Sequence, residues 1–121
     1  YDQVFDNLGT PREMGLILEK VLKGEIVSAE SSRQMLALMM RNTSNSSASQ
    51  YLSEDVLVAS KSGITAGTVN NAGIIYVSPN SRVVLCVFFK NLEEKNPEKA
   101  LLAEARIARL VYDHFSKAHS P

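Results

Sequence analysis

The sequence predicts an α+β domain in which a three-stranded antiparallel meander is packed by helices on both faces. Three apolar patterns with helical spacing predict helices over about residues 10–23, 28–42 and 97–117. Three runs rich in β-branched residues predict strands over about residues 56–63, 68–78 and 82–90. The whole chain, residues 1–121, is expected to form a single domain with one core.

The first helix has clear start and stop signals. Thr10 is a good N-cap, Pro11 suits the first helical position, and Glu13 can close a capping box. Gly24 is the expected C-terminal stop. The apolar residues that follow the start form one stripe, namely Met14, Ile17, Leu18, Val21 and Leu22.

The second helix is expected to start after the N-cap Ser28, with Glu30 in its first turn. Its apolar residues cover more than one face, so we expect its C-terminal end to be well buried. These residues are Met35, Leu36, Leu38, Met39 and Met40. The methionines are interpreted as core filling rather than as a pliable binding surface.

The middle of the chain predicts a connector followed by two hairpins. Residues 42–53 are rich in Ser and Asn, which favours a surface loop. The segments 65–67 and 79–81 are short enough for hairpin turns, so the strands should form an antiparallel meander. The third strand is apolar without alternation, which indicates that both of its faces are covered. Cys86, within it, is interpreted as a small buried hydrophobe because no charged neighbour would activate it.

The last helix begins with the signals Asn96, Pro97 and Glu98. Its inner stripe is expected to consist of Leu101, Ala105, Ala108, Val111 and Phe115. The charged residues Arg106, Arg109 and Asp113 are expected to face outward. The small alanines would let the helix lie close to the sheet.

The composition excludes several classes of protein. A hydrophobic content of 45% with 21% charged residues is ordinary for a globular domain and argues against disorder. A formal net charge of +0 gives no general attraction to nucleic acid or to an anionic membrane. The longest apolar run, Val83 to Phe89, is far shorter than the roughly 20 residues of a transmembrane helix.

We expect neither a metal nor a cofactor. The single cysteine excludes an intrachain disulfide and a cysteine cluster, and two histidines, His114 and His119, are too few for a site. The chain begins at Tyr1 rather than Met, so we expect it to be a processed or truncated product.

The first predicted strand ends in Lys61, Ser62 and Gly63. Strand periodicity puts Lys61 and Gly63 on one face and Ser62 on the other, although a terminal twist can bring both polar groups to one cleft. Lys61 could attract a carboxylate, Ser62 could donate to it, and Gly63 would let a peptide-like ligand approach the strand. The backbone N–H of Ile64 could stabilise an oxyanion. The tripeptide alone is a weak signal, since it also fits a solvated strand end.

Its surroundings add specificity. Thr-Pro-Arg-Glu-Met, Leu-Lys-Gly-Glu and Ser-x-x-Ser precede Lys-Ser-Gly, and Gly67-Thr-Val-Asn-Asn-Ala-Gly-Ile-Ile-Tyr76 follows it. In this order the motifs resemble the C-terminal half of a class A β-lactamase or a similar penicillin-recognising serine hydrolase. The resemblance covers nearly the whole chain and implies the corresponding part of the β-lactamase/transpeptidase-like fold.

The resemblance also implies a site. Lys61, Ser62 and Gly63 would line it, with the Ile64 N–H as oxyanion donor, and Thr65 and Asn70 are added as candidate substrate-binding residues. The ligand would be a β-lactam or a peptide-like small substrate. The resemblance further implies a secreted, periplasmic or cell-envelope protein of a bacterium.

Four departures from the family pattern matter. No Ser in the chain has Lys three residues later, so the nucleophile motif Ser-x-x-Lys is absent. Ser78-Pro79-Asn80 falls after Lys-Ser-Gly in a turn and is not the family's Ser-x-Asn, and residues 1–9 do not match the acidic loop residue. Asn70 and Asn71 stand where many members carry a basic residue that helps to bind the substrate carboxylate. In this chain only Lys61 and Ser62 would be left to bind that carboxylate.

The sequence therefore predicts the C-terminal portion of a serine hydrolase that forms an acyl-enzyme when combined with its N-terminal half. The isolated chain should be inactive because the nucleophile is missing. Its expected partner is that half or, through a swapped homodimer, a second copy, because a sheet edge would otherwise stay unpaired. The alternative is a non-catalytic module of the same fold that binds a peptide or protein.

Overall fold

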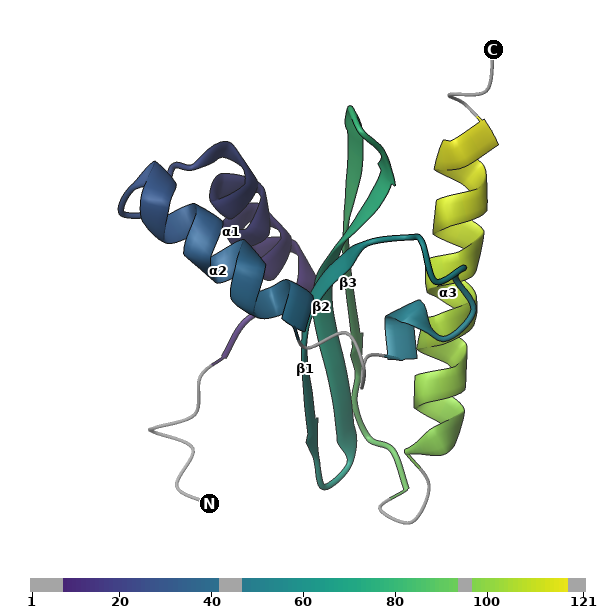
Figure 1. The fold of residues 1–121 in the computed structure, drawn as a ribbon. Coiled ribbons are helices and arrows are strands. Elements are labelled where there is room, and N and C mark those ends of the chain that lie inside the picture. Colours follow the sequence, from purple (N-terminus) through teal and green to yellow (C-terminus); the bar gives the residue numbers. More distant parts are fainter. Residues whose placement is uncertain (1–7, 42–46, 94–96, 118–121) are drawn as a thin grey trace.

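The structure, a computed structural model, describes residues 8–41, 47–93 and 97–117. Its elements follow in the order α1 (Pro11–Lys23), α2 (Ala29–Arg41), the short 3-10 helix η3 (Ser47–Ser49), β1 (Val58–Thr65), β2 (Thr68–Ser78), β3 (Ser81–Phe89) and α3 (Glu98–Lys117). The strands form one antiparallel sheet with the order β1-β2-β3. Helices α1 and α2 cover one face of it, and α3 with η3 covers the other (Figure 1). The predicted α+β meander with helices on both faces is therefore confirmed.

Some predicted features lie outside the described residues. They are the lead-in 1–7, the first part of the connector at 42–46, the helix-start residue Asn96, and His119.

Helix α1 begins and ends where its sequence signals indicate. The backbone N–H of Glu13 donates to Thr10 Oγ1 at 3.2 Å, and the N–H of Thr10 donates to Glu13 Oε2 at 2.8 Å, which completes the capping box. Gly24 adopts φ 73°, a left-handed conformation in which its N–H donates to Val21 O at 3.1 Å. Within the apolar stripe, only Leu18 and Val21 are fully buried.

Helix α2 corrects one expectation. Ser28 caps it, since its Oγ accepts from the N–H of Ser31 at 3.0 Å. Its C-terminal end is not well buried, however: Leu38 is 63% exposed, and Met39 and Met40 are only partly buried. The helix packs mainly against β1 and α1, and Leu38 lies on the side turned away from them.

The sheet separates two apolar clusters. On the α1/α2 face, Leu18 packs with Ala59, Ala72 and Ile74. On the α3 face, the cluster comprises Ala48, Ile75 and Ala108. Strand β3 is half-buried rather than fully covered, because it is an edge strand among the described elements.

Strand β1 lies two residues later than the predicted 56–63. Pairing continues to Thr65, which lies opposite Thr68, because Ala66 and Gly67 alone make the turn. Gly67 has φ 75°, a conformation that suits the two-residue hairpin. Pro79 and Asn80 form the second turn, one residue shorter than the expected 79–81, because Ser81 already pairs with Ser78 at the start of β3.

Helix α3 lies close to the sheet through its alanines. Ala105 and Ala108 are fully buried as predicted, and Arg109 pairs with Asp113 at 2.9 Å on the outer side. Phe115, expected in the inner stripe, is instead 38% exposed. Glu104, which was not expected there, is buried on the inner face as its polar member. Among the described residues, none of the helices is long and apolar enough to cross a membrane.

Candidate functional site

Lys61, Ser62 and Gly63 lie on β1, an edge strand of the described sheet. Lys61 pairs with Ala72, which belongs to the apolar cluster on the α1/α2 face, so Lys61 and Gly63 share that face. Ser62 pairs with Asn71, whose side chain contacts α3 at Glu104, so Ser62 lies on the opposite face. The side chains thus alternate as strand periodicity predicts.

The hydrogen-bonding pattern of β1 fixes which backbone groups face the open edge. Tyr76 N donates to Leu57 O at 3.0 Å, and the hairpin closes at Thr65 and Thr68, so odd-numbered residues of β1 bond to β2. The backbone groups of Ser62 and Ile64 therefore point away from β2. The Ile64 N–H lies on the open edge of β1, and Lys61 Nζ donates to the outward-facing Ser62 O.

Two glycines near this edge have opposite surroundings. A β-carbon placed on Gly63 would meet no heavy atom of the described residues within 4 Å, and its φ lies outside the left-handed region. A β-carbon on Gly73 would lie 3.0 Å from Ser60 Cβ and 3.1 Å from Ala59 O. The fold therefore requires glycine at Gly73, where β1 approaches β2 closely, but it does not require glycine at Gly63.

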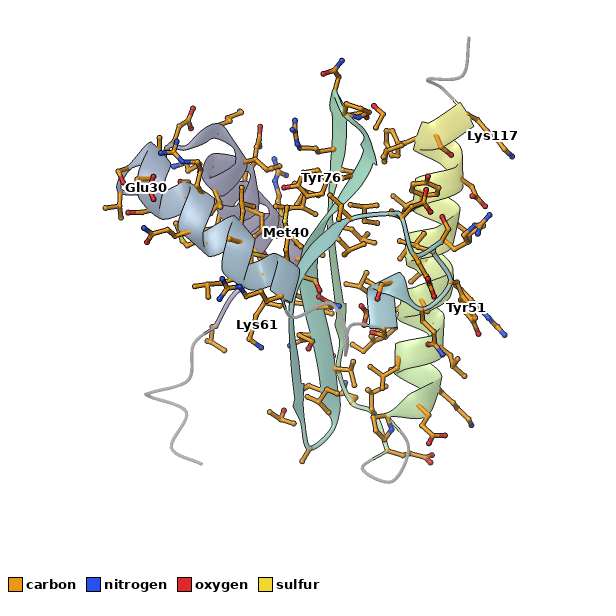
Figure 2. All side chains as sticks on the ribbon, viewed as in Figure 1. Glu30, Met40, Tyr51, Lys61, Tyr76 and Lys117 are labelled. Atoms are coloured by element: carbon orange, nitrogen blue, oxygen red, sulfur yellow. The ribbon has the colours of Figure 1, made fainter. Side chains whose placement is uncertain are left out.

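An open hollow flanks Lys61 at the C-terminal end of α2. It is lined by Leu38, Met39, Arg41, Ser60 and Lys61. In Figure 2, Lys61 lies below the end of α2. The lining contains two cationic side chains and no acidic one, so it is suited to an anion. Sequence reasoning missed Arg41, because a basic residue in the last turn of a helix already has an ordinary role beside the helix dipole.

The remaining candidates are placed differently. Asn70 lies opposite Gly63 and so shares the face of Lys61, whereas Asn71 is buried on the α3 face. Thr65 shares a hydrogen bond between hydroxyl groups with Thr68 across the hairpin. The structure thus brings Lys61, Gly63 and Asn70 together on one face of β1 and its neighbour.

Cys86 lies away from this edge on β3 and is partly buried. Burial raises the pKa of its thiol, and a backbone hydrogen bond to Gly73 only partly opposes that. The thiol is therefore not activated as a nucleophile. Among residues 8–41, 47–93 and 97–117, no group of three or more His, Cys, Asp or Glu side chains could hold a metal ion.

A helix-flanked antiparallel sheet with Lys-Ser-Gly on its edge strand agrees with the fold that the sequence resemblance implies. The model of the β-lactamase enzyme family matches residues 3–115, and the chain belongs to that family. A search of curated proteins gives no match.

Solved structures show the same likeness. The chain is 28% identical to a β-lactamase from Sphaerobacter thermophilus DSM 20745, with a TM-score of 0.69 over 84% of this chain and 39% of that one. It is 25% identical to PBP-A, with a TM-score of 0.79 over 96% of this chain and 43% of that one. The same values hold for a PBP-A mutant solved as an acyl-enzyme complex with penicillin G. The chain thus spans about two fifths of the length of these structures.

Proposed function

We propose that this chain forms one wall of a serine-hydrolase site that binds a β-lactam or a D-alanyl peptide. The observation that carries the proposal is the open space at Gly63. A strand interior disfavours glycine unless a bulge, a bend or a close approach calls for it, and no neighbour within the described residues makes that approach here. A ligand lying against the edge of β1 accounts for the residue.

Each group at the edge has a role in this proposal. The substrate carboxylate is bound by Lys61, with Arg41 across the shared hollow as a second positive charge. The Ser62 hydroxyl, on the other face of β1, is proposed to donate to the ligand around the open edge of the strand rather than within that hollow. The outward-facing N–H of Ile64 donates to the oxyanion that develops when the substrate amide is attacked, a contribution worth roughly 3 kcal/mol. Asn70 and Thr65 border the bound ligand beyond Gly63.

The nucleophile is proposed to come from an N-terminal half, because no Ser of the chain has Lys three residues later. The sheet has two edge strands, β1 and β3. If the ligand lies along β1, then strands from the partner would extend the sheet at β3. A swapped homodimer could cover the β3 edge in the same way but would not provide the Ser-x-x-Lys nucleophile.

Labelling with a fluorescent penicillin tests this proposal. The chain joined to its N-terminal half should be acylated, and the isolated chain should not. In the joined protein, Lys61→Ala should lose most of the labelling, while Lys90→Ala, an exposed lysine just beyond β3, should retain it. Labelling of the isolated chain would contradict the missing-nucleophile argument, and normal labelling of Lys61→Ala would remove Lys61 from the site.

A second candidate function is non-catalytic binding of a peptide along β1. The backbone groups of Ser62 and Ile64 that face the open edge favour it, because an extended peptide pairs with such an edge. The upstream sequence discriminates between the two functions. A parent protein that lacks Ser-x-x-Lys would support the binding module.

A further inference from the structure

The inner face of α3 carries a buried carboxylate that the proposed site does not use. Glu104 is 2% exposed, although it lies on a helix that otherwise buries alanines. Its Oε2 accepts from Ser47 Oγ at 2.6 Å, and its Oε1 accepts from Asn71 Nδ2. A carboxylate taken out of water depends on such donors, so both contacts are important for keeping it in place.

These two contacts join three parts of the fold. Glu104 belongs to α3, Ser47 to η3 in the connector before β1, and Asn71 to β2. Asn71 is 4% exposed and lies directly opposite Ser62 in the pairing of β1 with β2. The Glu104 carboxylate is therefore linked through one side chain, that of Asn71, to the strand position of Ser62, which follows Lys61.

The space around Glu104 leaves little room for a substitute donor. It borders a cavity of about 10 Å³ that is otherwise lined mainly by apolar side chains. A volume of that size accommodates at most about one water molecule. The Asn71 side chain is accordingly in direct contact with the Glu104 carboxylate in a space with little room for solvent.

We propose that Glu104 is a positioning residue for the Lys61–Ser62–Gly63 edge. By holding Asn71, it fixes the pairing of β1 with β2 at Ser62 and so the direction in which Lys61 and the Ile64 N–H are presented. The catalytic meaning of this role rests on the proposed function. The mechanical coupling itself does not, and it can be measured without any ligand.

Amide hydrogen exchange of the chain, followed by NMR, tests the coupling. The informative amides are those of Lys61 and Gly63, whose N–H groups bond to β2, and the reference amides are those of Ile75 and Val83, which pair between β2 and β3. Glu104→Gln keeps the shape of the side chain and an oxygen that can accept from Asn71, but removes the negative charge that strengthens this hydrogen bond. We expect exchange at Lys61 and Gly63 to accelerate about tenfold relative to the reference amides, as when a buried charge-assisted hydrogen bond becomes a neutral one.

A reversed pair provides the rescue. In Asn71→Asp combined with Glu104→Gln, the glutamine amide donates to the aspartate, so the hydrogen bond is restored with its polarity exchanged. Exchange at Lys61 and Gly63 should return to within about threefold of the unsubstituted chain. Asn71→Asp alone should be the worst variant, because it places two carboxylates together.

Ser47→Ala is the matched control, because it removes the other donor to the same carboxylate. It should leave the exchange of Lys61 and Gly63 near that of the unsubstituted chain. Uniform acceleration at all amides in Glu104→Gln, or equal effects of Ser47→Ala at the β1 edge, would overturn the proposal and leave Glu104 a general stabilising residue. If Glu104→Gln does not fold, the reversed pair decides: failure to restore protection at Lys61 and Gly63 refutes the coupling. None of these outcomes depends on acylation, so they are separate from failure of the proposed function.

Discussion

Replacing Gly63 and Gly73 by alanine, one at a time, separates a glycine kept for a ligand from a glycine kept for the fold. Both lie in neighbouring strands of one sheet and gain the same methyl group. The methyl group enters open space at Gly63, whereas at Gly73 it lies 3.0 Å from Ser60 Cβ. The two substitutions should therefore change stability in opposite directions.

The magnitudes follow from these surroundings. Alanine is favoured over glycine in a strand by about 0.5–1 kcal/mol, so Gly63→Ala should be neutral or stabilising by about 0.5 kcal/mol. Overpacking costs about 1–3 kcal/mol, so Gly73→Ala should destabilise the chain by about 1–2 kcal/mol after the same gain is subtracted. For a domain of this size, that difference corresponds to several degrees in Tm.

Thermal and urea unfolding of the two variants measure the stability, and penicillin labelling of the joined protein measures the function. Gly63→Ala should fold normally yet lose acylation about 100-fold, because its methyl group displaces the ligand from the β1 edge. If Gly63→Ala destabilises the chain as much as Gly73→Ala, the space at Gly63 is not open. If it folds and is acylated normally, the ligand does not lie against Gly63.

Two further predictions concern α1 and its connection to α2. Val27 has φ 58° and is 94% exposed, in a three-residue turn closed by a hydrogen bond of 2.6 Å from Ser28 N to Ile26 O. A β-branched residue is strained in this left-handed conformation, so Val27→Gly should stabilise the chain by about 1 kcal/mol in urea unfolding. Val27→Ala keeps the β-carbon and should give little of that gain; an equal gain would show that side-chain exposure rather than backbone strain is relieved. The backbone and side-chain hydrogen bonds of Thr10 lower the pKa of Glu13, so its contribution to stability is complete above the unfolded-state pKa, about 4.3, and is lost as the pH falls through the lower folded-state value. Unfolding measured between about pH 2 and pH 6 should therefore depend less on pH in Glu13→Gln than in the unsubstituted chain, and identical profiles would refute the assignment.

The helix boundaries could be predicted from sequence because their causes are local. Thr10, Glu13 and Gly24 act on groups within the same helix end, and their hydrogen bonds appear as expected. The start of β1 was misplaced because register depends on the partner strand and the turn. Only the left-handed Gly67 between paired threonines shows that the hairpin turn has two residues.

The placement of the candidate residues was predictable as far as one strand extends. Alternation along β1 placed Lys61 and Ser62 on opposite faces, and the structure agrees. Arg41 and Glu104 could not be found in this way, because each meets β1 or β2 only through tertiary packing. The buried glutamate had a weak signal: it sits between Ala100 and Ala108 on the helix face that otherwise carries small residues.

The two faces of β1 differ in how closely they are packed. On the α3 side, Gly73 allows close contact with Ser60, and Glu104 holds the neighbouring strand. On the other side, Gly63 is open and Lys61 is exposed. If Glu104 positions β1 as proposed, the strand would present charge and backbone donors in a fixed direction to a ligand on its open side. Substitutions on the α3 side of β1 should therefore alter reaction rates in the joined protein more than ligand affinity. Substitutions on the side of Lys61 and Gly63 should alter both.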